Sequence, residues 1–393
     1  MTTSSLLSTA RALLPEMIRV RRLLHGHPEV GLQLPVTRQL VIDELEAIGV
    51  AVHLHEKTSG LVGVIGADLD GPAVLLRADM DALPMPEDTG LSFASTNGAM
   101  HACGHDLHTS MLLGAARLLV GAADRLPGPV LLMFQPGEEG DHGARWMLEE
   151  GLLSTAGITP AHAFAIHVFS VFPSGMVGLK PGPLMASADE LFVTVTGRGG
   201  HASMPHLAAD PVPVAAEIIL AIETALTRRI PAFDPAVVTF GRMLAGTAHN
   251  VIPETALLNG TIRALSEDTR SAVHELVARV AHGIAAAHDV SVEVDIRIGY
   301  PVTVNDADRF AAVTASASSL IGPDAVQELP HPMMGAEDWS YVLQQVPGVM
   351  AFLGACPPHL EAATAPPNHS NRVDFDEEAM AVGAALYAAV ALG

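Results

Sequence analysis

Three short apolar runs in the first half of the chain each lead to acidic or histidine side chains, and this pattern restricts the fold more than any other. The runs are residues 73–78 before Asp79 and Asp81, residues 129–134 before Glu138 and Glu139, and residues 163–168, which contain His167. Strands that alternate with helices form a sheet covered by helices, and ligands gather beyond the carboxyl ends of its strands. The pattern therefore predicts an α/β fold with a functional site at one edge of the sheet.

Helical periodicity occupies segments before and between these runs. We expect helices at 5–24, 36–48, 107–123 and 144–150, and one more strand at 61–66. The apolar run 379–393 is too short to cross a bilayer and is rich in alanine and glycine. A buried terminal helix is therefore expected there.

The middle of the chain shows a different order of elements. Strand, helix, strand, strand, helix and strand follow one another at 190–197, 211–228, 236–244, 255–262, 267–288 and 291–298. This βαββαβ order is that of the split ferredoxin-like unit. The length of 393 residues agrees with two domains, because a single core usually stops growing at a smaller size. We expect a catalytic domain at 1–186 and 299–393, interrupted by an inserted domain at 187–298.

The formal net charge of −22 argues against nucleic acid or an anionic membrane surface as a partner. The N-terminal segment alternates apolar and charged residues without an uninterrupted apolar stretch, so we expect no signal peptide and a cytoplasmic protein. The two cysteines, Cys103 and Cys356, are too few for a disulfide framework. Cys103 stands between two histidines, which favours a role as a ligand.

The strongest chemical signal is the segment MHACGHDLHTS. It holds five potential donors close together: His101, Cys103, His105, Asp106 and His108. Thiolate and imidazole are ligands that zinc and similar metals prefer, and x-Cys-x-His spacing in a loop before a helix that starts at Leu107 can direct two donors to one point. The alternative is a loop with several surface histidines. The density of donors favours the metal site.

Two adjacent carboxylates, Glu138 and Glu139, lie in the glycine turn FQPGEEG. One can bind a metal while the other, in a partly dry site, keeps the proton affinity of a general base. Taken alone, a solvated acidic turn is the simpler explanation. His167 alone is likewise typical of a buried core histidine, and His369, in PPNHSNRVDF, of an exposed loop.

Asp79 and Asp81, in LLRADMDALP, share one face of the strand end by two-residue alternation. Each can cap a helix or pair with Arg77, and each can also orient a metal-binding histidine.

The inserted domain carries three further polar residues: His201 after a glycine turn, Asn250 in HNVIP and Arg263 in NGTIRAL. An imidazole, an amide and a guanidinium together would suit an amide oxyanion and a carboxylate. Spacing alone leaves open whether these three meet.

Taken together, the motifs resemble one branch of the aminoacylase–carboxypeptidase metallopeptidases. That branch contains hippurate hydrolases, hydrolases of indole-acetyl–amino acid conjugates and N-acetyl-diaminopimelate deacetylases. Between about residues 21 and 378 the chain shows, in the expected order, RRLLHGHPEVG, RADMDALPMPE, MHACGHDLHTS, QPGEEG, GGHASMPH, HNVIP, GAEDWSY and NHSNRVDFDEE. The resemblance implies a zinc-peptidase-like catalytic domain, with a mixed sheet flanked by helices, and an inserted dimerisation or lid domain. It is much less specific for the substrate.

The resemblance also implies the site. Two divalent metals, zinc or manganese, would be held by Cys103, His105, Glu139, His167 and His369, with Glu138 as the general base. Other branches hold the metals with a His-x-Asp strand end and a bridging Asp. Here Asp79-Met80-Asp81 replaces the first, His105 stands about where the bridging Asp would be, and Cys103 compensates. Asp79 is then expected beside the ligands, without binding a metal itself.

In the resembling family the inserted domain usually mediates a homodimer and lends a histidine to the partner's active site. His201 matches that histidine, while Asn250 and Arg263 match residues that hold the substrate's carboxylate. The implied reaction is cleavage of the amide bond of a small N-acyl amino acid, with an acetyl, benzoyl or similar acyl group. Glu138 would take a proton from the attacking water, whose pKa the metals lower, and return it to the departing amine. A homodimer or a higher homo-oligomer is expected.

Two other classes of protein share this pattern. A dipeptidase or carboxypeptidase would use the same metals and base and would differ only in its acyl pocket. A non-catalytic binding protein would lack a ligand or the base, and all six matched residues are present. The acyl group, the amino acid side chain and the role of the GAEDWSY turn around Glu337 stay open.

Overall fold

The computed structural model describes residues 3–393, whose packing divides them into two compact units. Unit 1 contains the described residues up to Leu184, together with Val304–His331 and Asp338–Gly393, and unit 2 contains Met185–Thr303 and Pro332–Glu337. Each unit has a hydrophobic core of its own. Among the helices of the described chain, none is both long and apolar enough to cross a membrane.

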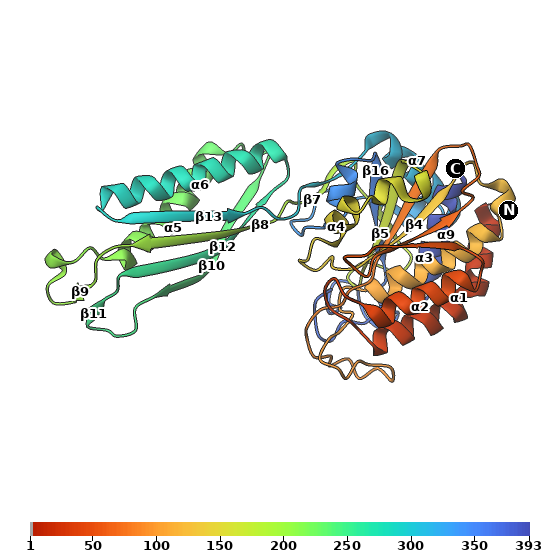
Figure 1. Ribbon diagram of the computed structural model, residues 1–393, viewed down its shortest axis with the longest axis horizontal. Helices are drawn as coiled ribbons and strands as arrows, with labels where there is room; N and C mark the ends of the chain where they lie inside the picture. Colours follow the sequence, from red (N-terminus) through yellow and green to blue (C-terminus); the bar gives the residue numbers. More distant parts are fainter. Residues whose placement is uncertain (1–2) are drawn as a thin grey trace. The chain divides into compact units, whose positions relative to one another are not determined.

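Unit 1 is built on an eight-stranded mixed sheet (Figure 1). Side by side, its strands are β1 (Ala51–Leu54), β2 (Leu61–Ile65), β4 (Val130–Gln135), β3 (Ala73–Asp79), β5 (Pro160–Phe169), β16 (Gly348–Gly354), β6 (Val177–Leu179) and β15 (Val326–Glu328). β3 pairs in parallel with β4 and β5, and β5 pairs in parallel with β16, whereas β1, β2 and β4 pair antiparallel. The predicted α/β fold with a mixed sheet is confirmed.

The central strands of this sheet are buried along their whole length. β2, β3, β4 and β16 have no exposed position, which explains why their sequences are continuous apolar runs and not alternating ones. Four strands of this sheet, β1, β6, β15 and β16, were not expected from the sequence, and β6 and β15 have only three residues each. β1 is short and mostly exposed, and β16 is an apolar run between glycines that leads to no polar cluster.

Helices cover this sheet (Figure 1). They are α1 (Thr3–Gly26), α2 (Pro35–Glu46), α3 (His105–Val120), α4 (Gly143–Glu149), α7 (Ala307–Ile321), α8 (Ser340–Leu343) and α9 (Ala379–Leu392), with 3-10 turns η1 (Ala123–Arg125), η2 (Leu152–Gly157) and η4 (Pro323–Ala325). The predicted helix start at Leu107 is corrected to His105. Gly104, whose φ of +88° a residue with a Cβ rarely adopts, allows the chain to turn into the helix two residues earlier.

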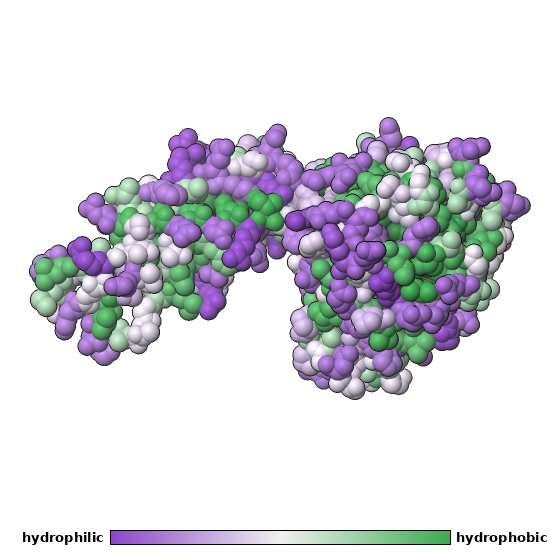
Figure 2. Space-filling view, viewed as in Figure 1, coloured by the Kyte–Doolittle hydropathy of each residue, from purple (hydrophilic) through white to green (hydrophobic). Residues whose placement is uncertain are grey.

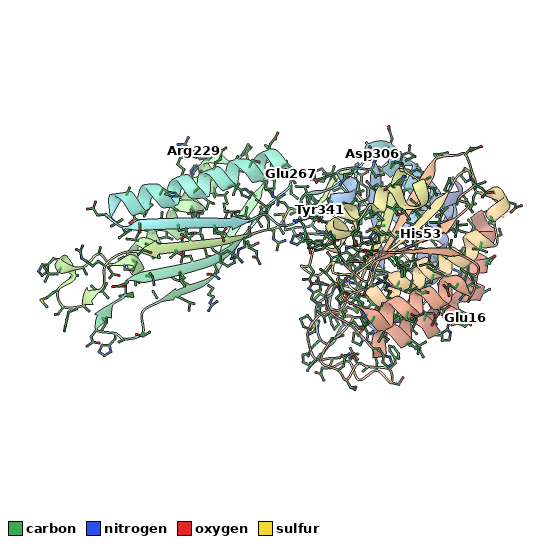
Figure 3. All side chains as sticks on the ribbon, viewed as in Figure 1. Glu16, His53, Arg229, Glu267, Asp306 and Tyr341 are labelled. Atoms are coloured by element: carbon green, nitrogen blue, oxygen red, sulfur yellow. The ribbon has the colours of Figure 1, made fainter. Side chains whose placement is uncertain are left out.

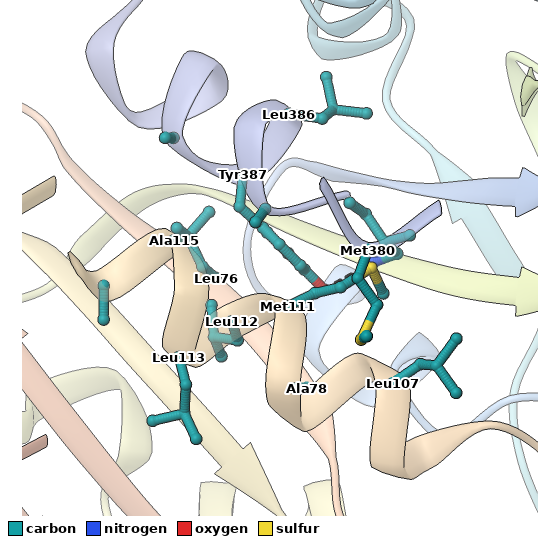
Figure 4. Close-up of a cluster of buried hydrophobic side chains, with 14 of the residues drawn as sticks. Leu76, Ala78, Leu107, Met111, Leu112, Leu113, Ala115, Met380, Leu386 and Tyr387 are labelled. Carbon is teal, nitrogen blue, oxygen red and sulfur yellow. Dashed lines mark hydrogen bonds between the residues drawn. The ribbon is translucent and has the colours of Figure 1, made fainter. Parts of the chain in front are cut away.

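The terminal helix α9 packs against α1 and α3. Figure 4 shows the contact with α3 around Met111, Met380 and Tyr387. The Tyr387 hydroxyl donates to the carbonyl oxygen of Arg77 at 2.7 Å and accepts the backbone N–H of Ile166 at 3.1 Å. One phenol from α9 therefore ties β3 to β5. The expectation of a buried terminal helix is confirmed.

Unit 2 contains a four-stranded antiparallel sheet with two helices. In chain order the elements are β8 (Asp189–Thr196), α5 (Pro211–Arg229), β10 (Ala236–Ala245), β12 (Thr255–Ala264), α6 (Glu267–Ala287) and β13 (Ser291–Arg297). The strand order is β10-β12-β8-β13, so the expected βαββαβ arrangement is present. Side-chain burial alternates along β8, because one face of the sheet packs on the core that α5 and α6 complete.

Further short elements are β9 (Gly200–His201), β11 (Val251–Ile252) and η3 (Pro205–Leu207) in unit 2, and β7 (Gly182–Met185) and β14 (Thr303–Asn305) where the chain passes from one unit to the other. Figure 2 shows both hydrophilic and hydrophobic residues on the surface of unit 2. The large apolar residues exposed on β10, β11 and β12 are Val237, Met243, Leu244, Val251 and Leu257.

An ion network around the buried carboxylate of Asp189 joins three segments of unit 2. The Asp189 carboxylate accepts from the guanidinium of Arg270 and, at 2.7 Å, from Nε2 of His274. Glu267, labelled in Figure 3, stands at the start of α6, pairs with Arg270 at 3.0 Å and accepts the backbone N–H of Val302 at 2.9 Å. The start of β8 is thereby fixed to α6 and to the chain after β13.

Candidate metal centre

The sheet of unit 1 brings the ends of its central strands to one edge, and the predicted donors follow those ends. Their positions are Cys103 in the loop before α3, His105 as its first residue, Glu138 and Glu139 after β4, His167 in β5 and His369 in the loop before α9. These donors come from segments far apart in the sequence. The parallel pairing of β3 with β4 and β5 explains their meeting.

Cys103 belongs to two groups of possible ligands. The ligand atoms of Cys103, His105 and His167 lie within 4.8 Å of one another, and so do those of Cys103, Glu139 and His369. The Cys103 sulfur is 3.4 Å from Nε2 of His167 and 3.2 Å from Nε2 of His369. One sulfur atom therefore stands between two sets of donors, each of which can hold a cation.

The ring orientations of His105 and His167 suit metal binding. Nδ1 of His105 lies 2.8 Å from the carbonyl oxygen of Asp81, and Nδ1 of His167 lies 2.9 Å from that of Val168. A carbonyl oxygen only accepts, so each Nδ1 must carry a proton, and Nε2 is the ring nitrogen that remains for a metal. Nε2 of His105 is a buried nitrogen without a hydrogen-bond partner among residues 3–393. A histidine whose Nδ1 is bonded to a carbonyl oxygen presents Nε2 in a fixed direction, as metal-binding histidines do.

The electrostatics of the cluster fit a cation as well. Burial raises the pKa of the Cys103 thiol, and the Glu139 carboxylate adds to this rise. Hydrogen bonds to Cys103 and Glu139 raise the pKa of His369 to about 10. Burial opposes the charge on His105, but Asp79 beside it outweighs burial and raises its pKa well above the usual value. A divalent cation would displace protons from these donors, so its affinity depends on pH.

Asp81 holds the turn that carries the two glutamates. Its Oδ1 accepts the backbone N–H of Glu138 at 2.9 Å, and its Oδ2 accepts that of Glu139 at 3.0 Å. Gly137 and Gly140, with φ values of +68° and +98°, give the turn its left-handed positions. The Glu138 side chain is buried and the Glu139 side chain is half-buried, so the pair differs in solvation although adjacent in sequence.

Asp79 bonds to a histidine outside the predicted ligand set. Its Oδ1 is 2.5 Å from Nδ1 of His108, and Nε2 of His108 accepts the backbone N–H of Val168 at 2.8 Å. Arg77 lies 2.6 Å from the other oxygen of Asp79. Burial opposes the charge on Asp79, but Arg77 and the neighbouring imidazoles hold its pKa well below the usual range. The sequence did not reveal the role of His108, which connects the end of β3 to the strand that carries His167.

In the GAEDWSY segment, Asp338 belongs to unit 1 and accepts hydrogen bonds from three residues of that unit. Its Oδ1 accepts from Gln135 at 2.7 Å and from Arg77 at 3.3 Å, and its Oδ2 accepts the backbone N–H of Ala144 at 2.9 Å. Asp338 is fully buried. Asp338 thus holds the Arg77 guanidinium that pairs with Asp79, and it accepts a backbone N–H in the first turn of α4. The adjacent Glu337 belongs to unit 2 and is buried as well.

The three residues singled out in the inserted region all lie in unit 2. His201 is an exposed residue of β9 and pairs with Val251 of β11, while the carbonyl oxygen of Asn250 accepts the N–H of Ala202 at 3.1 Å. These two residues are therefore neighbours. Arg263 lies on β12, where burial lowers its pKa and the charge of Asp189 partly opposes this shift.

The chain is similar to known proteins along nearly its whole length. The model of peptidase family M20/M25/M40 matches residues 75–393. The chain is 37% identical over 387 residues to thermostable carboxypeptidase 1 of Saccharolobus solfataricus (96% of this chain, 94% of the relative), and 35% identical over 384 residues to N-acetylcysteine deacetylase of Bacillus subtilis (97% of each). A solved dinuclear metal-binding peptidase of the M20 family from Bacillus subtilis matches with a TM-score of 0.83 and 34% identity (97% of this chain, 98% of that one).

Proposed function

The chain belongs to peptidase family M20/M25/M40 and is a metal-dependent hydrolase of amide bonds, and we propose that its substrates are small N-acyl amino acids or related conjugates. The observation that carries the proposal is the position of Cys103 between two donor sets, with the carboxylate of Glu138 beside them. The deacetylase relative, similar along 97% of both chains, favours acyl amino acids.

We propose that two divalent metals, zinc or manganese, occupy these sets. Cys103, His105 and His167 would hold one, and Cys103, Glu139 and His369 the other, with the sulfur shared. The buried Nε2 of His105, which has no hydrogen-bond partner in the described chain, supports this assignment. When bound, the metals supply a water of lowered pKa and polarise the amide carbonyl. Substituting Cys103→Ala should remove metal from both sets, as mass spectrometry of the purified protein would detect.

Glu138 is the proposed general base. The ligand atoms of His105, Glu138 and Glu139 lie within 4.8 Å of one another, so the carboxylate of Glu138 reaches the attacking water. It takes the proton of that water and then delivers it to the nitrogen of the departing amine, because the amine leaves poorly as an anion. The bonds that Asp81 makes to the turn keep this carboxylate in place.

The substrate contacts are proposed for unit 2. Its βαββαβ domain would form the interface of a homodimer, and His201 would stabilise the oxyanion in the partner's active site. Arg263 and Asn250 would hold the substrate's carboxylate. The exposure of His201 and the apolar residues exposed along β10–β12 support a role at an interface.

Substituting Glu138→Gln tests the proposed chemistry. It preserves size and should leave metal content unchanged, while turnover of N-acetyl and N-benzoyl amino acids falls by about 10²- to 10⁴-fold. Glu149→Gln, at an exposed position of α4, is the matched control and should leave turnover unchanged. Undiminished turnover by Glu138→Gln would disprove the role of the base.

A dipeptidase or carboxypeptidase activity is the second candidate, because the carboxypeptidase relative is as similar as the deacetylase. Both activities would use the same donors and base. A substrate panel of N-acetyl amino acids, N-benzoyl amino acids and dipeptides, with and without chelator, separates them. Faster hydrolysis of dipeptides than of every acyl amino acid would favour the second candidate.

A further inference from the structure

Asn368 stands next to the proposed ligand His369 and hydrogen-bonds to two other ligand-bearing segments. Its side-chain Nδ2 donates to the carbonyl oxygen of Cys103 at 3.2 Å and to that of Val168 at 2.9 Å. Its Oδ1 accepts the backbone N–H of Ser170 at 3.2 Å. One side chain therefore connects the loop of Cys103, the end of the strand that carries His167, and the loop of His369.

The amide orientation follows from its partners. Two carbonyl oxygens can only accept, and a backbone N–H can only donate, so a flipped amide would lose all three bonds. The Ser170 hydroxyl, fully buried, lies 3.3 Å from the same Oδ1 and donates to the carbonyl oxygen of Pro366 at 2.7 Å. The Asn368 amide thus uses both of its donor hydrogens on the segments of two other ligands.

The backbone at His369 needs such support. His369 has a φ of +68°, a left-handed conformation that a residue with a side chain adopts only under strain. Its side chain is 53% exposed, so packing alone does not hold the imidazole. The backbone N–H of His369 donates to the carbonyl oxygen of Ala102 at 2.9 Å. This bond joins the loop of His369 to the loop of Cys103, as the Asn368 side chain also does. Together these bonds set the separation of 3.2 Å between the His369 nitrogen and the Cys103 sulfur.

We propose that Asn368 is a positioning residue for the metal centre: its amide sets the spacing of Cys103, His167 and His369 and thereby the affinity for metal. Asn368 itself contacts neither metal nor substrate. This inference rests on the proposed ligand set. It concerns binding of the metal, so it can be tested without measuring turnover.

The experiment compares Asn368→Ala and Asn368→Asp with Asn371→Ala as the matched control. Asn371 lies in the same loop, and its side chain has no hydrogen bond to any of residues 3–393, although its carbonyl oxygen accepts from Asp88. Asn368→Asp keeps the shape and the acceptor but places a carboxylate oxygen against two carbonyl oxygens. Zn²⁺ affinity is measured by competition with a chromophoric chelator, and Co²⁺ absorption reports the geometry around the thiolate.

We expect Asn368→Ala to bind Zn²⁺ about 10- to 100-fold more weakly, Asn368→Asp at least as weakly, and Asn371→Ala like the wild type. The Co²⁺ spectrum should change only in the two Asn368 variants. Thermal unfolding of the metal-free proteins tests whether each variant is folded at the assay temperature. Wild-type affinity and an unaltered spectrum in Asn368→Ala or in Asn368→Asp would overturn the proposal.

Metal binding by the wild type and by the variants separates an error in the ligand set from an error in the role of Asn368. A wild-type protein that binds no metal refutes the ligand set itself. A wild-type protein that binds metal and loses it on Cys103→Ala, while the Asn368 variants bind normally, refutes only the role of Asn368.

Discussion

The carboxylate of Asp81 accepts the backbone N–H of Glu138 at 2.9 Å, so an acidic side chain after β3 holds the turn that carries the proposed base after β4. A second bond at 3.0 Å, from the N–H of Glu139, makes this contact bidentate. The proposed base and the proposed ligand beside it are thus positioned through their backbone N–H groups.

Replacing Asp81 by asparagine tests this arrangement. The amide can accept only one of the two N–H groups and turns its own NH₂ toward the other, so the turn is expected to shift. We predict a roughly 10- to 100-fold fall in kcat with little change in KM. Asp88→Asn, at an exposed position whose side chain pairs with Arg372, is the control and should leave both constants unchanged. Wild-type kcat in Asp81→Asn would show that the turn holds its shape without the carboxylate.

The proposed exchange of His201 between subunits predicts complementation. Glu138→Gln and His201→Ala should each be inactive as homodimers. When the two variants are mixed and allowed to exchange subunits, each mixed dimer contains one site with both native residues, and part of the activity should return. Turnover before and after exchange measures this. No recovery in mixtures shown to contain mixed dimers would place His201 in its own subunit's site or outside the mechanism.

A pH dependence of stability follows from His25, which is buried on α1 beside Asp106 and Glu87. Burial opposes its charge, but hydrogen bonds to the two carboxylates outweigh burial and raise its pKa to about 9. Protonated His25 therefore stabilises the folded protein. This contribution is complete below the pKa of the unfolded state, near 6.5, and is lost as the pH rises through the folded pKa of about 9. The contribution is on the order of 3 kcal/mol.

Urea unfolding of the wild type and of His25→Gln between pH 6.5 and 9.5 measures this contribution. The free energy of unfolding of the wild type should fall toward the value of the variant as the pH rises. An NMR titration of the His25 imidazole gives its midpoint directly. A constant difference between the two proteins, or a midpoint near the ordinary histidine value, would contradict the prediction.

Two glycine substitutions of the same kind should have opposite effects. A Cβ on Gly383 of α9 would lie 2.1 Å from Sδ of Met111 and 3.2 Å from Cδ2 of Leu353, so Gly383→Ala should destabilise the protein by about 1–3 kcal/mol. A Cβ on Gly283 of α6 would meet nothing within 4 Å. Gly283→Ala should therefore stabilise by up to about 1 kcal/mol, because alanine loses less backbone entropy in a helix. Denaturant midpoints compare the two, and equal shifts would contradict the packing of α9 on α3.

Local patterns were sufficient for much of the fold. The apolar runs at β2, β3, β4 and β5, the βαββαβ order of unit 2 and the apolar terminal helix could all be predicted, because hydrophobic periodicity depends on neighbours in the sequence. β1, β6, β15 and β16 were missed. β1 is a short exposed edge strand, β6 and β15 have three residues each, and β16 leads to no polar cluster. The start of α3 was placed too late, because a left-handed glycine allows an earlier turn than the apolar pattern shows.

The sequence by itself determined which chemical groups are present: a thiol and imidazoles within one short segment, paired carboxylates in a glycine turn, and two isolated histidines. Only the tertiary structure decided which of them meet and which atoms they offer. The tautomers of His105 and His167 depend on backbone carbonyl oxygens, His108 is occupied by Asp79 and Val168, and Asn368 joins segments whose positions in the chain differ by 198 and 265 residues. Hydrogen bonds of such range leave no periodic trace in the sequence, because they depend on how the sheet brings distant strand ends together.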